Sequence, residues 1–159
     1  MADWAQRLLD WFVKNQRPMP WRDDPRPYYV WLSEVMLQQT QVETVIPYFQ
    51  RFVQAFPDVQ ALAVAEQQAV LKRWEGLGYY ARARHLHKAA QVVVEQYNGE
   101  LPQNVHDLQK LPGFGPYTAA AVSSIAFAQP VPVVGWQCPA GGLPVVGNCN
   151  RHPSPTCSH

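Results

Sequence analysis

Two glycines and a proline in one short segment have the chemistry of a backbone site for an anion. Residues 111–119 read Leu-Pro-Gly-Phe-Gly-Pro-Tyr-Thr-Ala between two predicted helices. Gly113 and Gly115 permit a tight turn and a close approach of the main chain to another molecule. Pro116 suits the first position of a helix, where free N–H groups and the helix dipole favour a phosphate. The G-x-G spacing alone would fit an ordinary corner between helices, whereas the full nine-residue string is far more specific.

A short basic stretch follows Tyr80 and offers a second type of contact with phosphate. It contains Arg82, Arg84 and Lys88, and a solvated helix face explains it equally well. The whole chain carries 13 basic and 12 acidic residues, with a formal net charge of +1. A nucleic-acid partner would therefore be bound by a local patch and not by bulk charge.

Helices must position these residues, because apolar side chains recur with helical spacing along most of the chain. Residues 3–15 place Trp4, Leu8, Trp11 and Phe12 on one face. The other expected helices cover 29–39, 41–55 with Pro47 as a kink, 66–74, a segment through 86–97 that Asn98 and Gly99 end, 104–111 and 116–128. Residues 17–27 are expected to be a proline-broken loop, and Asp58 is expected to cap the segment that follows it. These patterns predict an all-α bundle with short connections.

The composition changes abruptly near residue 135. Of the 159 residues, 47% are apolar, which suffices for a core and excludes wholesale disorder. Residues 135–159 contain no Asp, Glu or Lys but hold all three cysteines, Cys138, Cys149 and Cys157. Their spacing lacks a C-x-x-C pair, so it is a weak signal for zinc or an iron–sulfur cluster, and we predict no metal site. We expect an N-terminal helix over 1–16, a helical domain over 17–134 and an aberrant, disordered tail over 135–159.

Four motifs in order resemble one family of DNA repair enzymes. They are Pro-Trp-Arg at 20–22, Ser-Glu-Val-Met-Leu-Gln-Gln-Thr-Gln-Val at 33–42, Gly-Leu-Gly-Tyr-Tyr at 76–80 and the 111–119 string. Together they resemble the adenine-specific mismatch DNA glycosylases of the MutY type, in the endonuclease III-like helix-hairpin-helix superfamily. The resemblance covers roughly residues 1–134. It implies a helix-hairpin-helix glycosylase bundle that hydrolyses the N-glycosidic bond of adenine mispaired with oxidised guanine or guanine.

The resemblance also assigns roles to individual residues. Glu34 would be the general acid that protonates the leaving base and helps to activate water, although a glutamate in such a segment is usually solvated or paired. Tyr117 would lie beside the scissile sugar, where related lyases carry a lysine nucleophile, so a monofunctional glycosylase is expected. The implied DNA-binding residues are Gln38, Gln39, Thr40, Tyr79, Arg82, Arg84, Leu111, Gly113, Phe114, Gly115, Tyr117 and Thr118. Trp21, Arg22 and Leu37 match the base pocket, and Gln39 and Tyr79 match the wedge that fills the vacated stack.

The sequence departs from the family pattern at Gly135, where the family has its second catalytic aspartate. A single inserted nucleotide near codon 135 would explain both this loss and the unusual tail, with a natural truncation as the alternative. A missing carboxylate about 4 Å from a developing cation is expected to cost roughly a thousandfold in rate. The four-cysteine 4Fe-4S cluster of the family would be absent, so we expect no cofactor in this chain. We also expect negligible adenine excision and poor solubility, since Trp4, Leu8 and Trp11 would lack their helical partners.

The expected partner is double-stranded DNA that contains a mismatched adenine. The N-terminus has no basic segment before an apolar stretch, and no apolar run reaches the length of a membrane span. We therefore expect a cytoplasmic, nucleoid-associated bacterial monomer with no membrane partner. Two alternatives remain: a non-catalytic helix-hairpin-helix DNA-binding fragment, and a glycosylase of another base specificity such as thymine.

Overall fold

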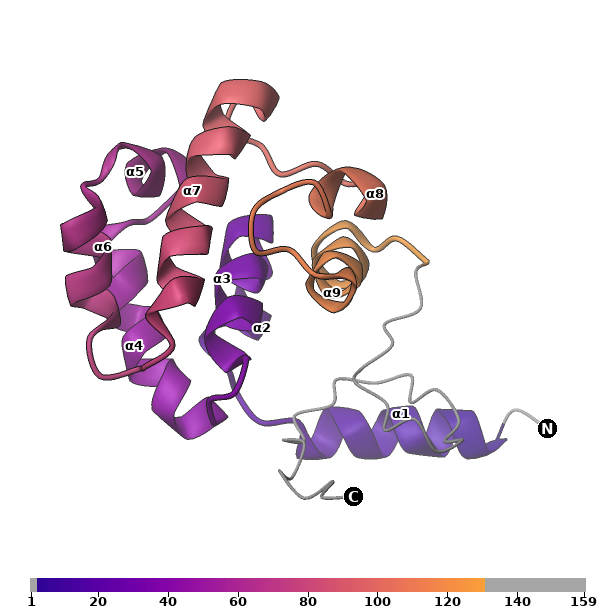
Figure 1. Ribbon diagram of the computed structural model, residues 1–159. Coiled ribbons are helices and arrows are strands. Elements are labelled where there is room, and N and C mark those ends of the chain that lie inside the picture. Colours follow the sequence, from indigo (N-terminus) through magenta and orange to yellow (C-terminus); the bar gives the residue numbers. More distant parts are fainter. Residues whose placement is uncertain (1–2, 131–159) are drawn as a thin grey trace, which may run out of the picture.

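The described part of the computed structural model, residues 3–130, folds into nine α-helices and contains no strand, which confirms the all-α prediction (Figure 1). Gly135, the three cysteines and the rest of the predicted tail lie outside the described residues. The helices are α1 (Asp3–Asn15), α2 (Pro20–Asp23), α3 (Pro27–Leu37), α4 (Val42–Ala55), α5 (Val59–Val64), α6 (Gln67–Trp74), α7 (Tyr80–Tyr97), α8 (Val105–Leu108) and α9 (Pro116–Phe127).

Helix α3 occupies the centre of the bundle. It packs against α4, α7 and α9, and α7 in turn packs against α5 and α6 (Figure 1). Eight of its residues are buried: Tyr28, Val30, Trp31, Leu32, Ser33, Glu34, Val35 and Met36. A helix that is apolar on all sides belongs inside a fold and not at its surface. The segment that carries Glu34 is therefore held on several sides by other helices.

Large side chains from α3, α4 and α6 build the core beside that central helix. The largest fully buried ones include Trp31, Phe49, Phe52 and Trp74. Phe52 meets Trp74 edge-on, with ring centroids 6.0 Å apart, and so joins α4 to α6. Helix α4 continues through Pro47. Aromatic pairs of this kind add to the stabilisation by buried area, so the α4–α6 layer is a firm support for α3 and α7.

Three expectations about element boundaries are wrong. The predicted loop over 17–27 contains α2, which begins at Pro20 because proline fits the first turn of a helix. The helix predicted over 29–39 begins at Pro27 and ends at Leu37, since Gln39 adopts a positive φ of 60°. The helix predicted over 104–111 is only the single turn Val105–Leu108.

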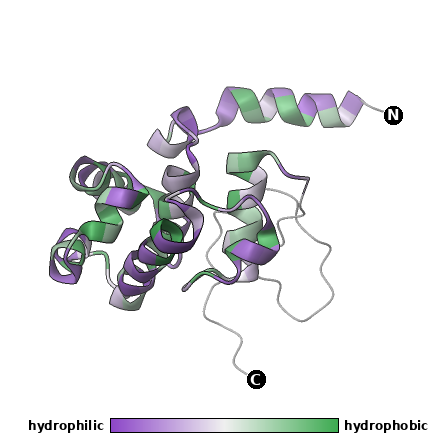
Figure 2. Ribbon diagram, turned by 90° about the horizontal axis from the view of Figure 1, so that it is seen from above, coloured by the Kyte–Doolittle hydropathy of each residue, from purple (hydrophilic) through white to green (hydrophobic). Residues whose placement is uncertain are grey.

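Helix α1 has the predicted amphipathic pattern but no buried residue. Trp4 is 70% exposed and Trp11 61% exposed, so the other helices within residues 3–130 leave this apolar face uncovered. Figure 2 shows the alternating hydrophobic and hydrophilic residues of α1, which extends away from the other helices. Within residues 3–130, no helix combines the length and the apolar character that crossing a bilayer requires.

Capping residues end α7 and start α5 at the positions that the sequence predicts. Asn98 and Gly99 both have positive φ, and the N–H of Gly99 donates to the Val93 carbonyl at 3.0 Å. Asp58 precedes α5, and its Oδ1 accepts a hydrogen bond of 2.7 Å from the Ala61 N–H. Both capping predictions are confirmed.

Replacing Asp58 by alanine should lower the free energy of unfolding by about 1 kcal/mol, because one N–H of the first turn of α5 loses its acceptor. Urea denaturation followed by circular dichroism measures the change. Asp58→Asn keeps an oxygen acceptor and is the matched control, for which we expect a change of only a few tenths of a kcal/mol. Equal losses in the two variants would contradict the capping role.

Candidate functional site

The turn between α8 and α9 is the predicted phosphate-binding element. The N–H of Phe114 donates to the Leu111 carbonyl at 3.2 Å and closes the turn. Leu111 and Phe114 are buried, and the Phe114 ring lies 5.2 Å from the ring of Trp31. Gly113 is exposed. The two apolar side chains thus anchor the turn in the core, so the parts of it that remain for a ligand are mostly backbone.

Gly113 is required by two separate features of the turn. Its φ of +77° lies in the left-handed region, which favours glycine. A Cβ atom at this position would also lie 2.7 Å from the Cβ of His85 in α7. His85 was missed by sequence reasoning, because only the fold brings it beneath the turn. Gly115, by contrast, has a φ of −81° and open space where a Cβ would stand.

Helix α9 begins at Pro116, as predicted, with Gly115 as its N-cap. Gly115 has no side chain with which to cap the N–H groups at this helix start. Thr118 is buried, and its hydroxyl accepts a hydrogen bond of 3.1 Å from the Gln38 side-chain amide. This bond joins the end of α3 to the start of α9. Tyr117, in the first turn of α9, is half-buried.

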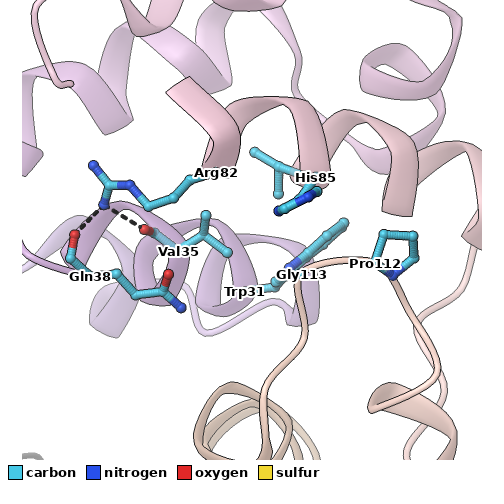
Figure 3. Close-up of a pocket in the computed structure, with 8 residues that line it drawn as sticks. Trp31, Val35, Gln38, Arg82, His85, Pro112 and Gly113 are labelled. Carbon is cyan, nitrogen blue, oxygen red and sulfur yellow. Dashed lines mark hydrogen bonds between the residues drawn. The ribbon is translucent and has the colours of Figure 1, made fainter. Parts of the chain in front are cut away.

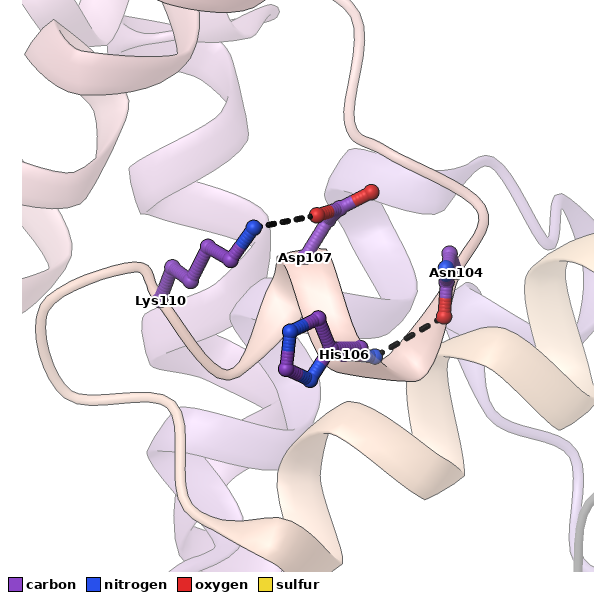
Figure 4. A network of polar contacts seen from close by, with 4 residues as sticks. All are labelled: Asn104, His106, Asp107 and Lys110. Carbon is purple, nitrogen blue, oxygen red and sulfur yellow. Dashed lines mark hydrogen bonds and ion pairs between the residues drawn. The ribbon is translucent and has the colours of Figure 1, made fainter.

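A small polar network fixes the single turn of α8 ahead of the hairpin (Figure 4). The Asn104 side chain accepts a hydrogen bond of 2.9 Å from the His106 N–H, and Lys110 forms an ion pair of 2.8 Å with Asp107. The hydrogen bond from Lys110 holds the pKa of Asp107 below its ordinary value. These contacts link the single turn of α8 to the residues on either side of it, of which Lys110 directly precedes the hairpin.

Glu34 is the buried acid among residues 3–130, with only 8% of its surface exposed. Burial raises the pKa of this carboxyl to about 7, because an ionised group is poorly solvated there, while the positive charge of Arg22 partly opposes the shift. Burial likewise lowers the pKa of Arg22, and Glu34 opposes that shift. A carboxyl with a pKa near neutrality can exist as the acid and can donate a proton.

The structure places the other predicted base-pocket residues in α2 and at the end of α3. Trp21 is buried, and its ring meets Phe49 edge-on with centroids 5.1 Å apart. Leu37 is half-buried against the core. The guanidinium of Arg22 lies 5.9 Å from the ring centroid of Phe12 in α1. Of these residues, Arg22 is the one whose charge acts on Glu34.

The two predicted wedge residues, Gln39 and Tyr79, are both exposed and lie in two loops beside Arg82. The Arg82 guanidinium points inward and donates to backbone carbonyls of α3, including that of Val35 at 2.9 Å (Figure 3). Burial lowers the pKa of Arg82. Its neighbours Arg84 and Lys88 are exposed, and with His85 they line an open depression of about 520 Å³ on α7.

No group of three or more His, Cys, Asp or Glu residues that could hold a metal ion occurs within residues 3–130. The described segment also contains no cysteine, because Cys138, Cys149 and Cys157 all come later in the chain. The described residues therefore do not supply the ligands of an iron–sulfur cluster.

The substitution Gly113→Ala should destabilise the fold by about 1–3 kcal/mol, because alanine is strained at positive φ and its Cβ would clash with His85. Gly115→Ala is the matched control, for which we expect less than about 1 kcal/mol, since that Cβ meets open space. Thermal unfolding followed by circular dichroism distinguishes the two variants. Equal stability of both would contradict the close contact between the turn and α7.

The variant Glu34→Gln should stabilise the protein, and the gain should grow with pH. The pKa of Glu34 is higher in the folded state than in the unfolded chain, so the folded state binds more protons and wild-type stability falls as pH rises from about 4.5 to about 7. The glutamine variant escapes this loss, which amounts to about 3 kcal/mol above pH 7. Urea titrations at pH 4 and pH 8 measure it.

The variant Glu43→Gln, at an exposed carboxylate of α4, is the control for removing an acid at the surface. A stabilisation by Glu34→Gln that is the same at pH 4 and pH 8 would contradict the raised pKa.

Several known proteins resemble this chain in sequence or in fold. The adenine DNA glycosylase of Mus musculus is 48% identical over 136 residues, which cover 80% of this chain and 26% of that protein. The enzyme of the same name from Buchnera aphidicola (strain Bp) is 42% identical over 123 residues, which cover 77% of this chain and 35% of that protein. The chain thus spans about a quarter to a third of the length of these relatives.

Solved structures agree on the fold. A thermostable thymine-DNA glycosylase superposes with a TM-score of 0.76 at 27% identity, over 83% of this chain and 61% of that one. A trapped endonuclease III–DNA covalent intermediate superposes with a TM-score of 0.71 at 24% identity, over 82% of this chain and 60% of that one. Residues 32–139 match the family described as HhH-GPD superfamily base excision DNA repair proteins. The chain, with its glycine turn ahead of α9 and its buried glutamate in α3, belongs to the HhH-GPD superfamily.

Proposed function

We propose that this chain binds double-stranded DNA and removes adenine mispaired with oxidised guanine or guanine, by hydrolysis of the N-glycosidic bond. The observation that carries the proposal is Glu34, an acid with a pKa of about 7 in the helix that is bonded to the start of α9. Adenine is proposed as the substrate base because relatives that are 42–48% identical to this chain are adenine DNA glycosylases.

In the proposed binding mode, the hairpin holds the phosphate backbone through main-chain N–H groups. The helix start at Gly115 has no side-chain cap, and an anion can take that place. Arg84 and Lys88, both exposed on α7, would add charge contacts to neighbouring phosphates. Gln39 and Tyr79 would fill the space that the extruded nucleotide leaves.

In the proposed reaction, the Glu34 carboxyl donates its proton to a ring nitrogen of the extruded adenine. The bond between C1′ and the base breaks, its electron pair stays with the neutral adenine, and an oxocarbenium-like sugar remains. Water adds its oxygen to C1′, and the Glu34 carboxylate accepts the proton that the water loses. Tyr117, beside the sugar, has no amine to form a Schiff base, so the reaction ends at the abasic site.

A second candidate, a DNA-binding module without catalysis, is favoured by Gly135, which replaces the family's second carboxylate. The loss of that carboxylate is expected to slow the reaction roughly a thousandfold, so DNA binding would be the main property of this chain. A single experiment separates the two candidates.

With the full chain in excess over a duplex that has an oxidised guanine–adenine mismatch, we expect only the residual adenine release that a roughly thousandfold loss of rate leaves. The rate should fall about tenfold for each pH unit above 7, because only the protonated Glu34 can act as the acid. Glu34→Gln should reduce the rate by roughly a hundredfold or more, while Glu43→Gln should not. The measurement is chromatography of the released base over several hours.

Duplexes with a guanine–thymine mismatch and with matched pairs are the substrate controls. Binding of the mismatched duplex with release no faster than in Glu34→Gln, at every pH, would contradict the glycosylase and support the DNA-binding module. Release of thymine in place of adenine would contradict the proposed base specificity.

A further inference from the structure

Arg82 joins the two loops that carry Gln39 and Tyr79. Its Nη1 donates to the carbonyls of Val35 and Met36 at 2.9 Å each, and also to the carbonyl of Gln38. Figure 3 shows the guanidinium above the end of α3, with its bonds to Val35 and Gln38.

The second terminal nitrogen of Arg82, Nη2, donates to the Thr40 hydroxyl and to the Gly78 carbonyl, at 3.3 Å each. Through these five acceptors, one side chain contacts the end of α3 and both loops.

The bonds from Nη1 complete the end of α3. The last carbonyls of a helix have no partner within the helix, and a cation at this end is favourable for the helix dipole. Arg82 supplies both the donors and the charge from α7. The chain can leave the helix at Leu37 because these carbonyls are satisfied from outside the helix.

The two predicted wedge residues share an unusual backbone conformation. Gln39 has a φ of 60° and Tyr79 a φ of 50°, which residues other than glycine rarely adopt. Such conformations persist when the surrounding contacts determine them, and they cluster at functional sites. Gln39 lies between two acceptors of Arg82, at Gln38 and Thr40, and Tyr79 directly follows the Gly78 acceptor.

Ring contacts fix the second loop as well. The Arg82 guanidinium carbon lies 5.4 Å from the ring centroid of Tyr79 and 5.5 Å from that of Trp74. The indole N–H of the buried Trp74 donates to the Gly78 carbonyl at 3.0 Å. Tyr79 is nevertheless 60% exposed, so its ring is held on one side and open on the other. This is the arrangement that a stacking residue needs before it meets a base.

We propose that Arg82 is a positioning residue that sets Gln39 and Tyr79 at the spacing and angle needed to enter the base stack. This inference rests on the proposed function, since it explains how Gln39 and Tyr79 are held in place to act as the wedge. It assigns Arg82 a role different from the phosphate contact that the basic stretch suggests, because the guanidinium donates to the protein's own backbone. Arg82 also lines a cavity of about 40 Å³ with Pro112 and Gly113, so the wedge site adjoins the hairpin.

The variant Arg82→Lys tests the proposal. A lysine amine can replace the Nη1 bonds at the end of α3 but cannot supply the second nitrogen that bonds Thr40 and Gly78. The probe is a duplex with an oxidised guanine–adenine mismatch, a 2′-fluoro sugar on the adenosine to prevent hydrolysis, and 2-aminopurine as the neighbouring base. Unstacking of that base raises its fluorescence.

We expect the wild-type chain to raise the fluorescence and Arg82→Lys to lose most of this increase, about tenfold at equal occupancy. The Kd for a fully matched duplex should change by less than about threefold, because the hairpin contacts remain. Arg73→Lys, at an exposed position of α6, is the matched control and should behave as wild type. Thermal unfolding of each variant accompanies the titrations.

The outcomes distinguish the proposed function from the positioning role of Arg82. No fluorescence increase with the wild-type chain would contradict the proposed function itself. A normal increase with Arg82→Lys would overturn the positioning role and leave the proposed function standing. Parallel losses of matched-duplex affinity, fluorescence and melting temperature would show a merely structural role and also overturn it. Should Arg82→Lys not fold, Thr40→Val, which removes one Nη2 acceptor, must lower the fluorescence increase, and a wild-type increase would overturn the proposal.

Discussion

The burial of a carboxyl group in the central helix is the constraint on which the rest of this structure depends. Helix α3 is apolar on nearly every side, yet Glu34 lies within it with 8% of its surface exposed. Burial raises the pKa of Glu34 because water no longer stabilises the carboxylate charge, and the positive charge of Arg22 offsets this shift only in part. The bundle around α3 accepts this cost in stability, which is typical of sites selected for chemistry and not for folding.

The elements next to α3 are joined to it by polar contacts at one end. Gln38 reaches the buried hydroxyl of Thr118 in α9, and Arg82 reaches the last carbonyls of α3 from α7. The hairpin, the two loops and the acid-bearing helix therefore meet within a few residues of Gln38. Their relative positions are determined by hydrogen bonds between helices, so a displacement of one of them would strain the others.

Local chemistry in the sequence predicted the helix starts and ends at Asp58, Asn98 and Pro116, because a cap depends on neighbours a few residues away. The early end of α3 was not predictable in this way, since it depends on Arg82, which lies 44 residues after Gln38. The motifs indicated Glu34, but its burial depends on helices that pack from three directions. The contact of His85 with Gly113 and the inward direction of the Arg82 side chain could not be predicted for the same reason, since both depend on segments that are distant in the sequence.

The contact beneath the hairpin has an evolutionary consequence. The atom of His85 that lies closest to the missing side chain of Gly113 is its Cβ, which every residue except glycine possesses. The imidazole ring itself is not the obstacle, so many residue types are sterically admissible at position 85. Of this pair of positions, selection for the turn therefore falls on position 113, and related sequences can vary at position 85 while they keep the glycine above it.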